Sequence, residues 1–385
     1  MKIKFSNISQ PTLNSKIFAD FKKNPPAFFA LPKSDFSEIE KFAAKNKQWR
    51  QVLIIGIGGS SLPARTLTAA LSGKNSPEFY FLENLDPTSA KRIFTKLDFK
   101  KTLVIVISKS GGTLETLANF FVVKKFLGNA WRKQVVVITE SEKGFLRELA
   151  KKEKLTTFEI PAEIGGRFSI LSPVGLLPAA LAGANLGELL DGARKADARK
   201  ALNFAQLQAA EFQRGKNITT FCVYADTLKG FAKWWEQLLA ESIGKSSKIG
   251  ITPEIAVGVT DQHSKLQLWA DGPNDKFFTF LGVRNFGKDF KIPNPPKDFG
   301  FLKNKSMQQI LQAEFLATTK SLVERRRPLA ILEIEKIDEE SLGKLAQFWM
   351  LEVYFLGKLL KVNPFSQPGV ERGKILTKKI LKPTN

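Results

Sequence analysis

Short apolar runs alternate with stretches of helical spacing along most of the chain. The runs QVLII at 51–55, LVIVI at 103–107 and VVVIT at 135–139 contain almost no polar residues, so each predicts a strand that is buried on both faces. Glycine-rich turns and longer amphipathic segments follow the first two runs. Strands that alternate with helices in this way are typical of a parallel sheet covered on both sides. We therefore predict an α/β fold.

The same pattern divides the chain into four parts. Residues 1–48 are polar and interrupted by prolines, with one helix expected at 35–46. A first α/β unit is expected at 49–195 and carries the glycine-rich turns. The strand and helix pattern resumes after a helical stretch, which predicts a second α/β unit at 196–362. Residues 363–385 should form a helical tail.

Composition places the chain among ordinary globular proteins. Of its 385 residues, 43% are hydrophobic and 25% are charged, which is enough to build a large core. The longest apolar runs are far shorter than the roughly 20 residues that span a bilayer, and the first residues lack the apolar region of a signal peptide. A single cysteine, Cys222, excludes an intrachain disulfide. These features favour a cytoplasmic protein with no membrane partner.

The formal net charge of +22 leaves two interpretations open. Clustered Lys and Arg side chains neutralise phosphates in nucleic-acid binders. Here the basic residues are spread along the chain and no zinc-finger or RNP pattern accompanies them, so we favour a solvated basic surface over a nucleic-acid partner. Such a surface still attracts a small anionic substrate.

Two turns between a strand and a helix have the composition of a phosphate site. In GIGGSS at 56–61 and SKSGGT at 108–113, the following helix presents unpaired backbone N–H groups to an anion. The second turn adds three hydroxyl groups and a cation, from Ser108, Ser110, Thr113 and Lys109. The alternatives are a pair of tight turns with capping hydroxyls, or a dinucleotide site, although the GxGxxG spacing is missing.

Gln237 and Glu241 stand four residues apart in FAKWWEQLLAESIGK, which we expect to form a helix that ends at Gly244. The two side chains should therefore share one face. A carboxylate held in this way can act as a general base. An exposed helical glutamate is the alternative.

Three further residues are candidates for contact with a charged substrate. Arg167 lies in the flexible stretch GGRFS, where it could reach a buried anion or form a structural ion pair. Lys374 is expected on the helix that follows Gln367 and its turn, with a solvated lysine as the alternative. His263 is the chain's one histidine, and it could be either a proton-exchanging group or a buried, hydrogen-bonded core residue.

Taken together, these segments resemble the glucose-6-phosphate isomerase family. The segments that carry the resemblance occur in the family's order and cover roughly residues 50 to 375: GIGGSSL, LENLDP, ISKSGGTLETL, GGRFSILSPVGL, EQLLAESIGK, DQHSKLQL with DGP, and NPFSQPGVERGK. The resemblance implies two SIS-type α/β/α sandwich domains with parallel sheets. It also implies interconversion of glucose 6-phosphate and fructose 6-phosphate without a cofactor or a metal.

The resemblance assigns a role to each candidate residue. Glu241 would move the proton between C2 and C1, and Arg167 would stabilise the enediolate. His263 and Lys374 would open the sugar ring, with His263 reaching the site of the neighbouring subunit in a homodimer. Substrate contacts would come from Ser60, Ser108, Lys109, Ser110, Thr113, Gln237 and Gln367.

Three positions differ from the family pattern, and other functions stay open. Gly112 stands where the family commonly has threonine, Ser366 replaces a usual aspartate, and Arg372 replaces a usual aliphatic residue. We expect these changes to tune affinity. The alternatives are a sugar-phosphate-binding regulator without activity and an isomerase that also accepts mannose 6-phosphate.

Overall fold

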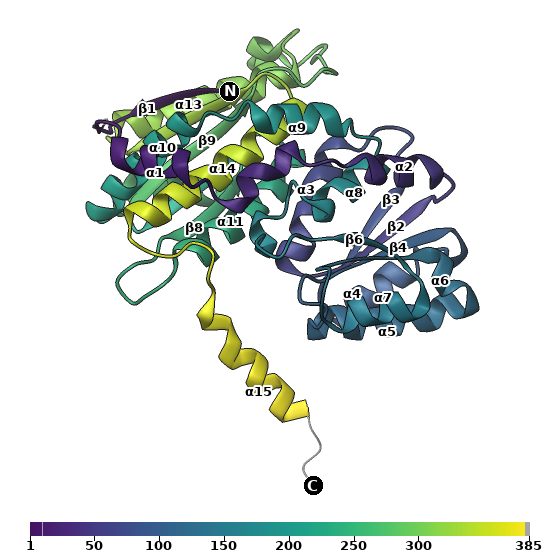
Figure 1. Cartoon of the computed structure of the whole chain (residues 1–385). Coiled ribbons are helices and arrows are strands. Elements are labelled where there is room, and N and C mark those ends of the chain that lie inside the picture. The colour runs from purple at the N-terminus through teal and green to yellow at the C-terminus, as the bar shows by residue number, and fades with distance from the viewer. Residues whose placement is uncertain (10, 382–385) are drawn as a thin grey trace.

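A computed structural model describes residues 1–9 and 11–381 of the chain, and it arranges the strands in two five-stranded sheets (Figure 1). The first sheet has the order β3-β2-β4-β5-β6 and is parallel throughout. Its strands are β2 (Gln51–Ile55), β3 (Glu78–Leu82), β4 (Thr102–Ile107), β5 (Val135–Thr139) and β6 (Thr156–Glu159).

The second sheet has the order β1-β10-β9-β7-β8 and is parallel except for its edge strand β1, which pairs antiparallel with β10. Its strands are β1 (Lys2–Ser6), β7 (Ile218–Val223), β8 (Thr252–Val257), β9 (Lys276–Val283) and β10 (Leu329–Ile334).

Helices cover both faces of the first sheet because its strands are apolar on both sides. Leu53 and Ile55 of β2 face one layer, and Val52 and Ile54 face the other. The first layer holds α4 (Pro87–Phe94), α5 (Leu114–Leu127), α6 (Trp131–Gln134) and α7 (Phe145–Glu153). The second holds α2 (Ser37–Lys45), α3 (Leu62–Leu71) and α8 (Pro173–Leu181).

The second sheet is covered in the same way. Its outer layer consists of α12 (Gln262–Asp271) and α13 (Met307–Glu324). Its inner layer consists of α10 (Ala198–Gln213), α11 (Lys229–Ile243) and α14 (Glu339–Leu359). The remaining helices are α1 (Ser15–Lys23), α9 (Leu186–Arg194) and α15 (Glu371–Leu381). The 3₁₀ turns are η1 (Ala27–Lys33), η2 (Gly58–Ser60), η3 (Phe99–Lys101), η4 (Gly128–Ala130), η5 (Gly166–Phe168), η6 (Asp226–Leu228), η7 (Lys297–Leu302) and η8 (Pro368–Val370).

The two inner helix layers pack against each other and share one apolar core. Leu67 of α3, Leu177 of α8, Leu238 of α11 and Phe348 of α14 all belong to this core and are fully buried. Because the core is continuous, it holds the carboxyl end of α11 next to the turns that follow the strands of the first sheet. This contact is what builds the site described below.

The predicted α/β class, with two sandwiches and a C-terminal helix, is confirmed. The helix expected at 35–46 is present as α2, and α11 ends at Gly244 as expected. The sequence did not predict β1, which joins the N-terminal residues to the second sheet. The predicted boundaries at 48, 195 and 362 stay a prediction.

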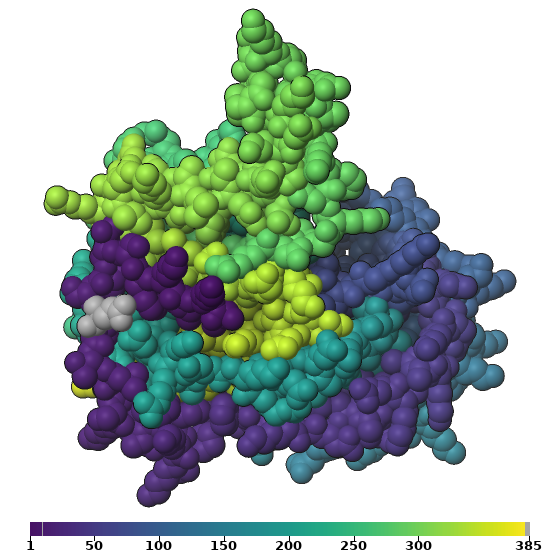
Figure 2. All heavy atoms as spheres, turned by 90° about the horizontal axis from the view of Figure 1, so that it is seen from above, coloured from purple at the N-terminus to yellow at the C-terminus, as the bar shows by residue number. Residues whose placement is uncertain are grey.

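Two segments project from the body. In Figure 2 the chain around residue 300 stands out from the surface, and its side chains Phe290, Phe299 and Phe301 are exposed. In Figure 1 helix α15 points away from both sandwiches. Every residue of α15 is exposed, including Ile375, Leu376 and Ile380.

Candidate active site

The two glycine-rich turns lie side by side at the carboxyl edge of the first sheet. They follow β2 and β4, which are neighbouring strands. From β2 the chain continues to β3 on one side and then to β4 on the other side, so the strand order reverses between β2 and β4. A Cβ at Gly56 would lie 3.2 Å from the Ile107 carbonyl oxygen, so the two turns are in close contact. The crevice at such a switch point is where open α/β sheets bind their ligands.

The turn at 108–113 holds its hydroxyl groups in fixed positions. Ser108 is fully buried, and its Oγ lies 2.8 Å from Thr113 Oγ1 at the start of α5. Lys109 Nζ donates to the Ala162 carbonyl at 2.6 Å, while Ser110 is exposed. Gly111 has a φ of +65°, a conformation that a side chain would strain. Ser108 and Thr113 therefore meet at the amino end of α5, whereas the Lys109 ammonium is held at the loop after β6.

The turn at 56–61 packs closely against η5, the turn that carries Arg167, and Ser169 Oγ donates to the Gly59 carbonyl at 3.2 Å. A Cβ at Gly59 would come within 2.3 Å of the Gly166 carbonyl carbon, so only glycine allows this approach. Ser60, a predicted substrate contact, closes η2 and is partly buried. The side chain of Gln237 from α11 lies over Gly58, where a Cβ would be 2.9 Å from its Nε2. Three separate parts of the chain meet at this point.

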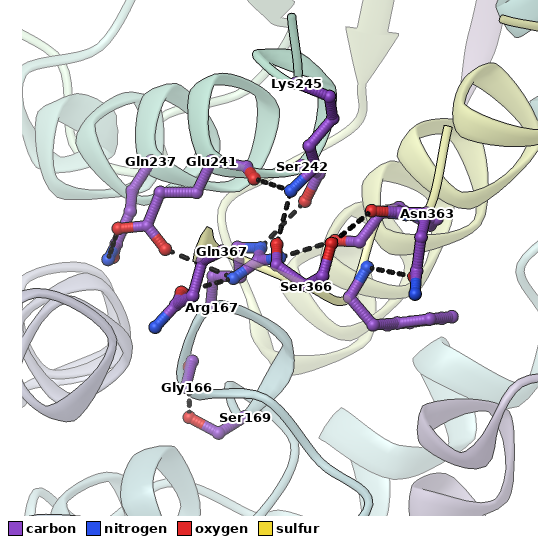
Figure 3. A network of polar contacts seen from close by, with 12 residues as sticks. Gly166, Arg167, Ser169, Gln237, Glu241, Ser242, Lys245, Asn363, Ser366 and Gln367 are labelled. Atoms are coloured by element: carbon purple, nitrogen blue, oxygen red, sulfur yellow. Dashed lines mark hydrogen bonds and ion pairs between the residues drawn. The ribbon is translucent and has the colours of Figure 1, made fainter. Parts of the chain in front are cut away.

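Arg167 is the centre of the site, and all five of its N–H groups have acceptors (Figure 3). Nε donates to Ser242 Oγ at 2.8 Å, and Nη2 donates to the carbonyls of Pro364 at 2.5 Å and Ser366 at 3.2 Å. Nη1 donates to Glu241 Oε2 at 3.2 Å and Gln367 Oε1 at 2.8 Å. The side chain is only 2% exposed. Burial lowers the pKa of the guanidinium, and the Glu241 carboxylate offsets part of this shift.

Both partners of Nη1 are side chains that are at least partly open to solvent, whereas Nε and one Nη2 contact are made to buried residues. Glu241 is 33% exposed and Gln367 is exposed, whereas Ser242 and Pro364 are buried. A substrate oxygen can therefore reach the guanidinium at Nη1 by displacing or joining these two acceptors. The Nε and Nη2 contacts serve to anchor the arginine.

Gln237 and Glu241 share a face of α11, as their spacing predicted. Gln237 Nε2 donates to Glu241 Oε1 at 2.9 Å. The other amide atom, Gln237 Oε1, is buried and has no hydrogen-bond partner among the residues that the structure describes. Leaving a buried polar atom without a partner costs free energy. A ligand hydroxyl that donates to this oxygen would remove that cost. The helix behind it is fixed, since Trp234 Nε1 donates to the Arg167 carbonyl at 3.0 Å.

Two predicted site residues do not join this cluster. Lys374 lies on the projecting α15, where its Nζ pairs with Glu371 of the same helix at 2.7 Å. His263 is the second residue of α12 and is exposed, which excludes the buried core alternative for this histidine. The structure thus brings together one set of candidate residues and leaves His263 and Lys374, the pair expected to open the ring, outside it.

Sequence reasoning missed two residues that support the cluster. Ser242 accepts from Arg167 Nε, and Lys245 Nζ donates to the Glu241 carbonyl at 2.6 Å and to the Ser366 carbonyl. Lys245 directly follows Gly244, and a basic residue at the carboxyl end of a helix is the signal that could have identified it. Ser242 gave no such signal, because its contact crosses 75 residues of chain.

Other features of the surface do not compete with this site. A hollow of about 770 Å³ lies at the amino ends of β2 and β3, the edge opposite to the one where parallel sheets bind ligands. Within residues 1–9 and 11–381, no group of three or more His, Cys, Asp and Glu side chains could hold a metal ion. In the same part of the chain, no helix has the length and apolar character needed to cross a membrane.

Comparisons with known proteins agree on one family. A family model described as phosphoglucose isomerase matches residues 38–274. The glucose-6-phosphate isomerase of Rubrobacter xylanophilus is 38% identical over 385 aligned residues, which cover 92% of this chain and 89% of that one. The chain belongs to the phosphoglucose isomerase family.

Two solved structures are similar in fold to this chain. A hypothetical protein from Thermus thermophilus is 36% identical, with a TM-score of 0.88 over 96% of this chain and 94% of that one. A glucose-6-phosphate isomerase from Chlamydia trachomatis is 24% identical, with a TM-score of 0.77 over 97% of this chain and 76% of that one, and it shows the fold. The predicted SIS-type architecture is confirmed.

Proposed function

We propose that this phosphoglucose isomerase family member interconverts glucose 6-phosphate and fructose 6-phosphate through a cis-enediolate. The observation that carries the proposal is the cluster of Glu241, Gln237, Arg167 and Gln367 at the carboxyl edge of the first sheet, beside the turn at 108–113. This cluster combines a base, a cation and amides with a phosphate cradle. The relative from Rubrobacter xylanophilus, named glucose-6-phosphate isomerase, supports the same substrate pair.

Glu241 is the base in this proposal. Isomerisation requires a proton to leave C2 and a proton to return at C1, and one carboxylate placed over the plane of the intermediate can serve both steps. Glu241 is partly open to solvent and has neighbours on both of its oxygens, from Gln237 and Arg167. These contacts orient the carboxylate without burying it.

Arg167 stabilises the negative charge that develops on the sugar oxygens. Its guanidinium is already anchored at Nε and Nη2, so it needs no reorganisation when the enediolate forms. The Nη1 edge, shared with Glu241 and Gln367, is where the substrate oxygens are expected. Gln237 Oε1 would then accept from a sugar hydroxyl.

The phosphate group binds at the turn 108–113 in this account. In this proposal Ser108, Ser110, Thr113 and Ser60 supply hydroxyl groups. Lys109, whose ammonium donates to the Ala162 carbonyl in the free protein, supplies a positive charge. The net charge of +22 attracts the anionic substrate from a distance. Phosphorylated sugars are substrates of the cytoplasm, and we place the protein there.

Ring opening is assigned to His263 and Lys374 in a homodimer. His263 is exposed on α12, so a second copy of the chain can use it. The exposed aromatic side chains of the projecting segment around residue 300 and the apolar residues of α15 are surfaces that such a dimer would cover. An isologous dimer would place two such histidines symmetrically.

A coupled assay that detects glucose 6-phosphate formed from fructose 6-phosphate tests the proposal with purified protein. We expect turnover without an added cofactor or metal. Binding of the sugar phosphate without turnover would instead support the regulator, and turnover of mannose 6-phosphate would establish the wider specificity.

A further inference from the structure

Lys245 connects two parts of the cluster that are far apart in the sequence. It lies two residues beyond the end of α11, and its side chain is partly buried. Its Nζ donates to the carbonyl of Glu241, one turn back, and to the carbonyl of Ser366 (Figure 3). One ammonium group therefore ties the helix that carries the proposed base to the loop that carries Gln367.

The Ser366 carbonyl accepts from two cations. Arg167 Nη2 donates to it at 3.2 Å, and Lys245 is its second donor. The loop is also stiffened locally, because Asn363 Oδ1 accepts from the Phe365 backbone N–H at 2.9 Å. Gln367 follows directly and presents its Oε1 to Arg167 Nη1. The position of Gln367 thus depends on how firmly Ser366 is held.

Ser366 and Gln367 are the residues just before the projecting helix that still contact the body. Within residues 1–9 and 11–381, the hydrogen bonds of α15 side chains stay inside the helix, from Lys374 to Glu371 and from Thr377 to Gly373. All residues from 365 to 381 are exposed. The backbone contact of Ser366 with Lys245 and Arg167, together with the side-chain contact of Gln367, is consequently the fixed point from which α15 starts.

We propose that Lys245 is a positioning residue, which holds the loop 363–367 so that Gln367 meets Arg167 and α15 leaves the body in a defined direction. The proposal rests on the isomerase function for its kinetic consequences. The hydrogen bonds of Lys245 go to two carbonyl oxygens of the protein, so it acts on the reaction through Gln367 and the start of α15. Its loss should therefore lower turnover more than it weakens substrate binding.

The test compares Lys245→Met with Lys248→Met, a matched control because Lys248 is an exposed lysine three residues further along. We expect Lys245→Met to lower kcat about tenfold with KM changed less than about twofold, and Lys248→Met to match the unchanged protein. Lys245→Arg, which keeps a cation able to donate to two carbonyls, should restore most of kcat. Equal kinetics for the two Met variants, or a rise in KM alone, would overturn the proposal.

A second measurement is independent of activity. Hydrogen exchange of the backbone amides at 363–370 should be faster in Lys245→Met than in Lys248→Met, while exchange at 108–113 is unchanged. Unchanged hydrogen exchange at 363–370 would overturn the positioning role of Lys245 even if kcat fell. Should Lys245→Met fail to fold, Lys245→Gln keeps a donor without the charge and is expected to show a smaller change in the same direction. If the protein without substitutions showed no activity, the isomerase function would be contradicted. The exchange data would still test whether Lys245 positions the loop 363–367.

Discussion

The proposed catalytic residues fall into two groups that the chain treats very differently. Arg167, Glu241, Gln237 and Gln367 are joined by hydrogen bonds of 2.8 to 3.2 Å at the contact between the two sandwiches. His263 and Lys374 are exposed on α12 and α15, and α15 projects away from the body in Figure 1. The first group is assembled by one chain on its own.

The difference follows from burial. Arg167 is buried and must find acceptors for five N–H groups, so its neighbours are fixed by the cost of leaving any of them unpaired. Lys374 and His263 face solvent, where water satisfies their polar atoms equally well in many positions. We infer that proton transfer is prearranged within the subunit, whereas ring opening depends on a movement of α15 and on a second copy of the chain.

The largest effect is expected from Arg167→Lys. An ammonium group has three donors, so it cannot replace the five N–H contacts, and kcat should fall by about 10²- to 10³-fold. Steady-state kinetics with fructose 6-phosphate measures this loss. Arg327→Lys is the control, because Arg327 is also a buried arginine, but its Nη2 donates to the carbonyls of Ala270 and Gly272 and it lies just before β10. A similar loss of kcat in both variants would mean that the effect is structural.

The role of His263, from the exposed group, can be tested by complementation between subunits. If inactive Glu241→Gln and inactive His263→Ala chains are unfolded, mixed and refolded together, random pairing makes about half of the dimers mixed, and each of these regains one complete site. Activity should recover to about a quarter of that of the unchanged protein. Mixed dimers that mass spectrometry detects but that show no activity would mean that His263 serves its own subunit or has no part in the reaction.

A smaller effect is expected at the phosphate turn. Replacing Lys109 and Ser110 together by alanine should raise KM for fructose 6-phosphate about tenfold or more, since each charge-assisted hydrogen bond contributes roughly 1.5–3 kcal/mol. The melting temperature should change little, because both side chains are at least partly exposed. Lys151→Ala on α7 removes an exposed lysine elsewhere and should leave KM unchanged. An unchanged KM in the double variant would place the phosphate elsewhere, with the turn at 56–61 as the next candidate.

The sequence predicted those features that depend on local pattern. The apolar runs of β2, β4 and β5 and the i,i+4 pair of Gln237 and Glu241 are visible without a structure. Strand β1 was missed because it is short and only partly buried, so its residues lack the apolar run of a central strand. The burial of Arg167 could not be predicted either, since its acceptors Ser242 and Gln367 lie 75 and 200 residues further along the chain.

The motif order also predicted roles that the chain alone does not assemble. Lys374 was expected near the base, but its position depends on where α15 lies, and the residues of that helix make no buried contact with the body that could direct it. Long-range contacts of this kind are set by packing with a partner or a ligand, and no local pattern encodes them.

The most direct test of the account follows deuterium uptake from D₂O at C2 of glucose 6-phosphate. The unchanged protein should exchange the C2 proton during turnover, and Glu241→Gln should slow this exchange by about 10²- to 10⁴-fold while still binding the sugar phosphate, because the amide keeps the shape of the carboxylate but cannot accept a proton. Exchange at the rate of the unchanged protein in Glu241→Gln would contradict the assignment of Glu241 as the group that moves the proton.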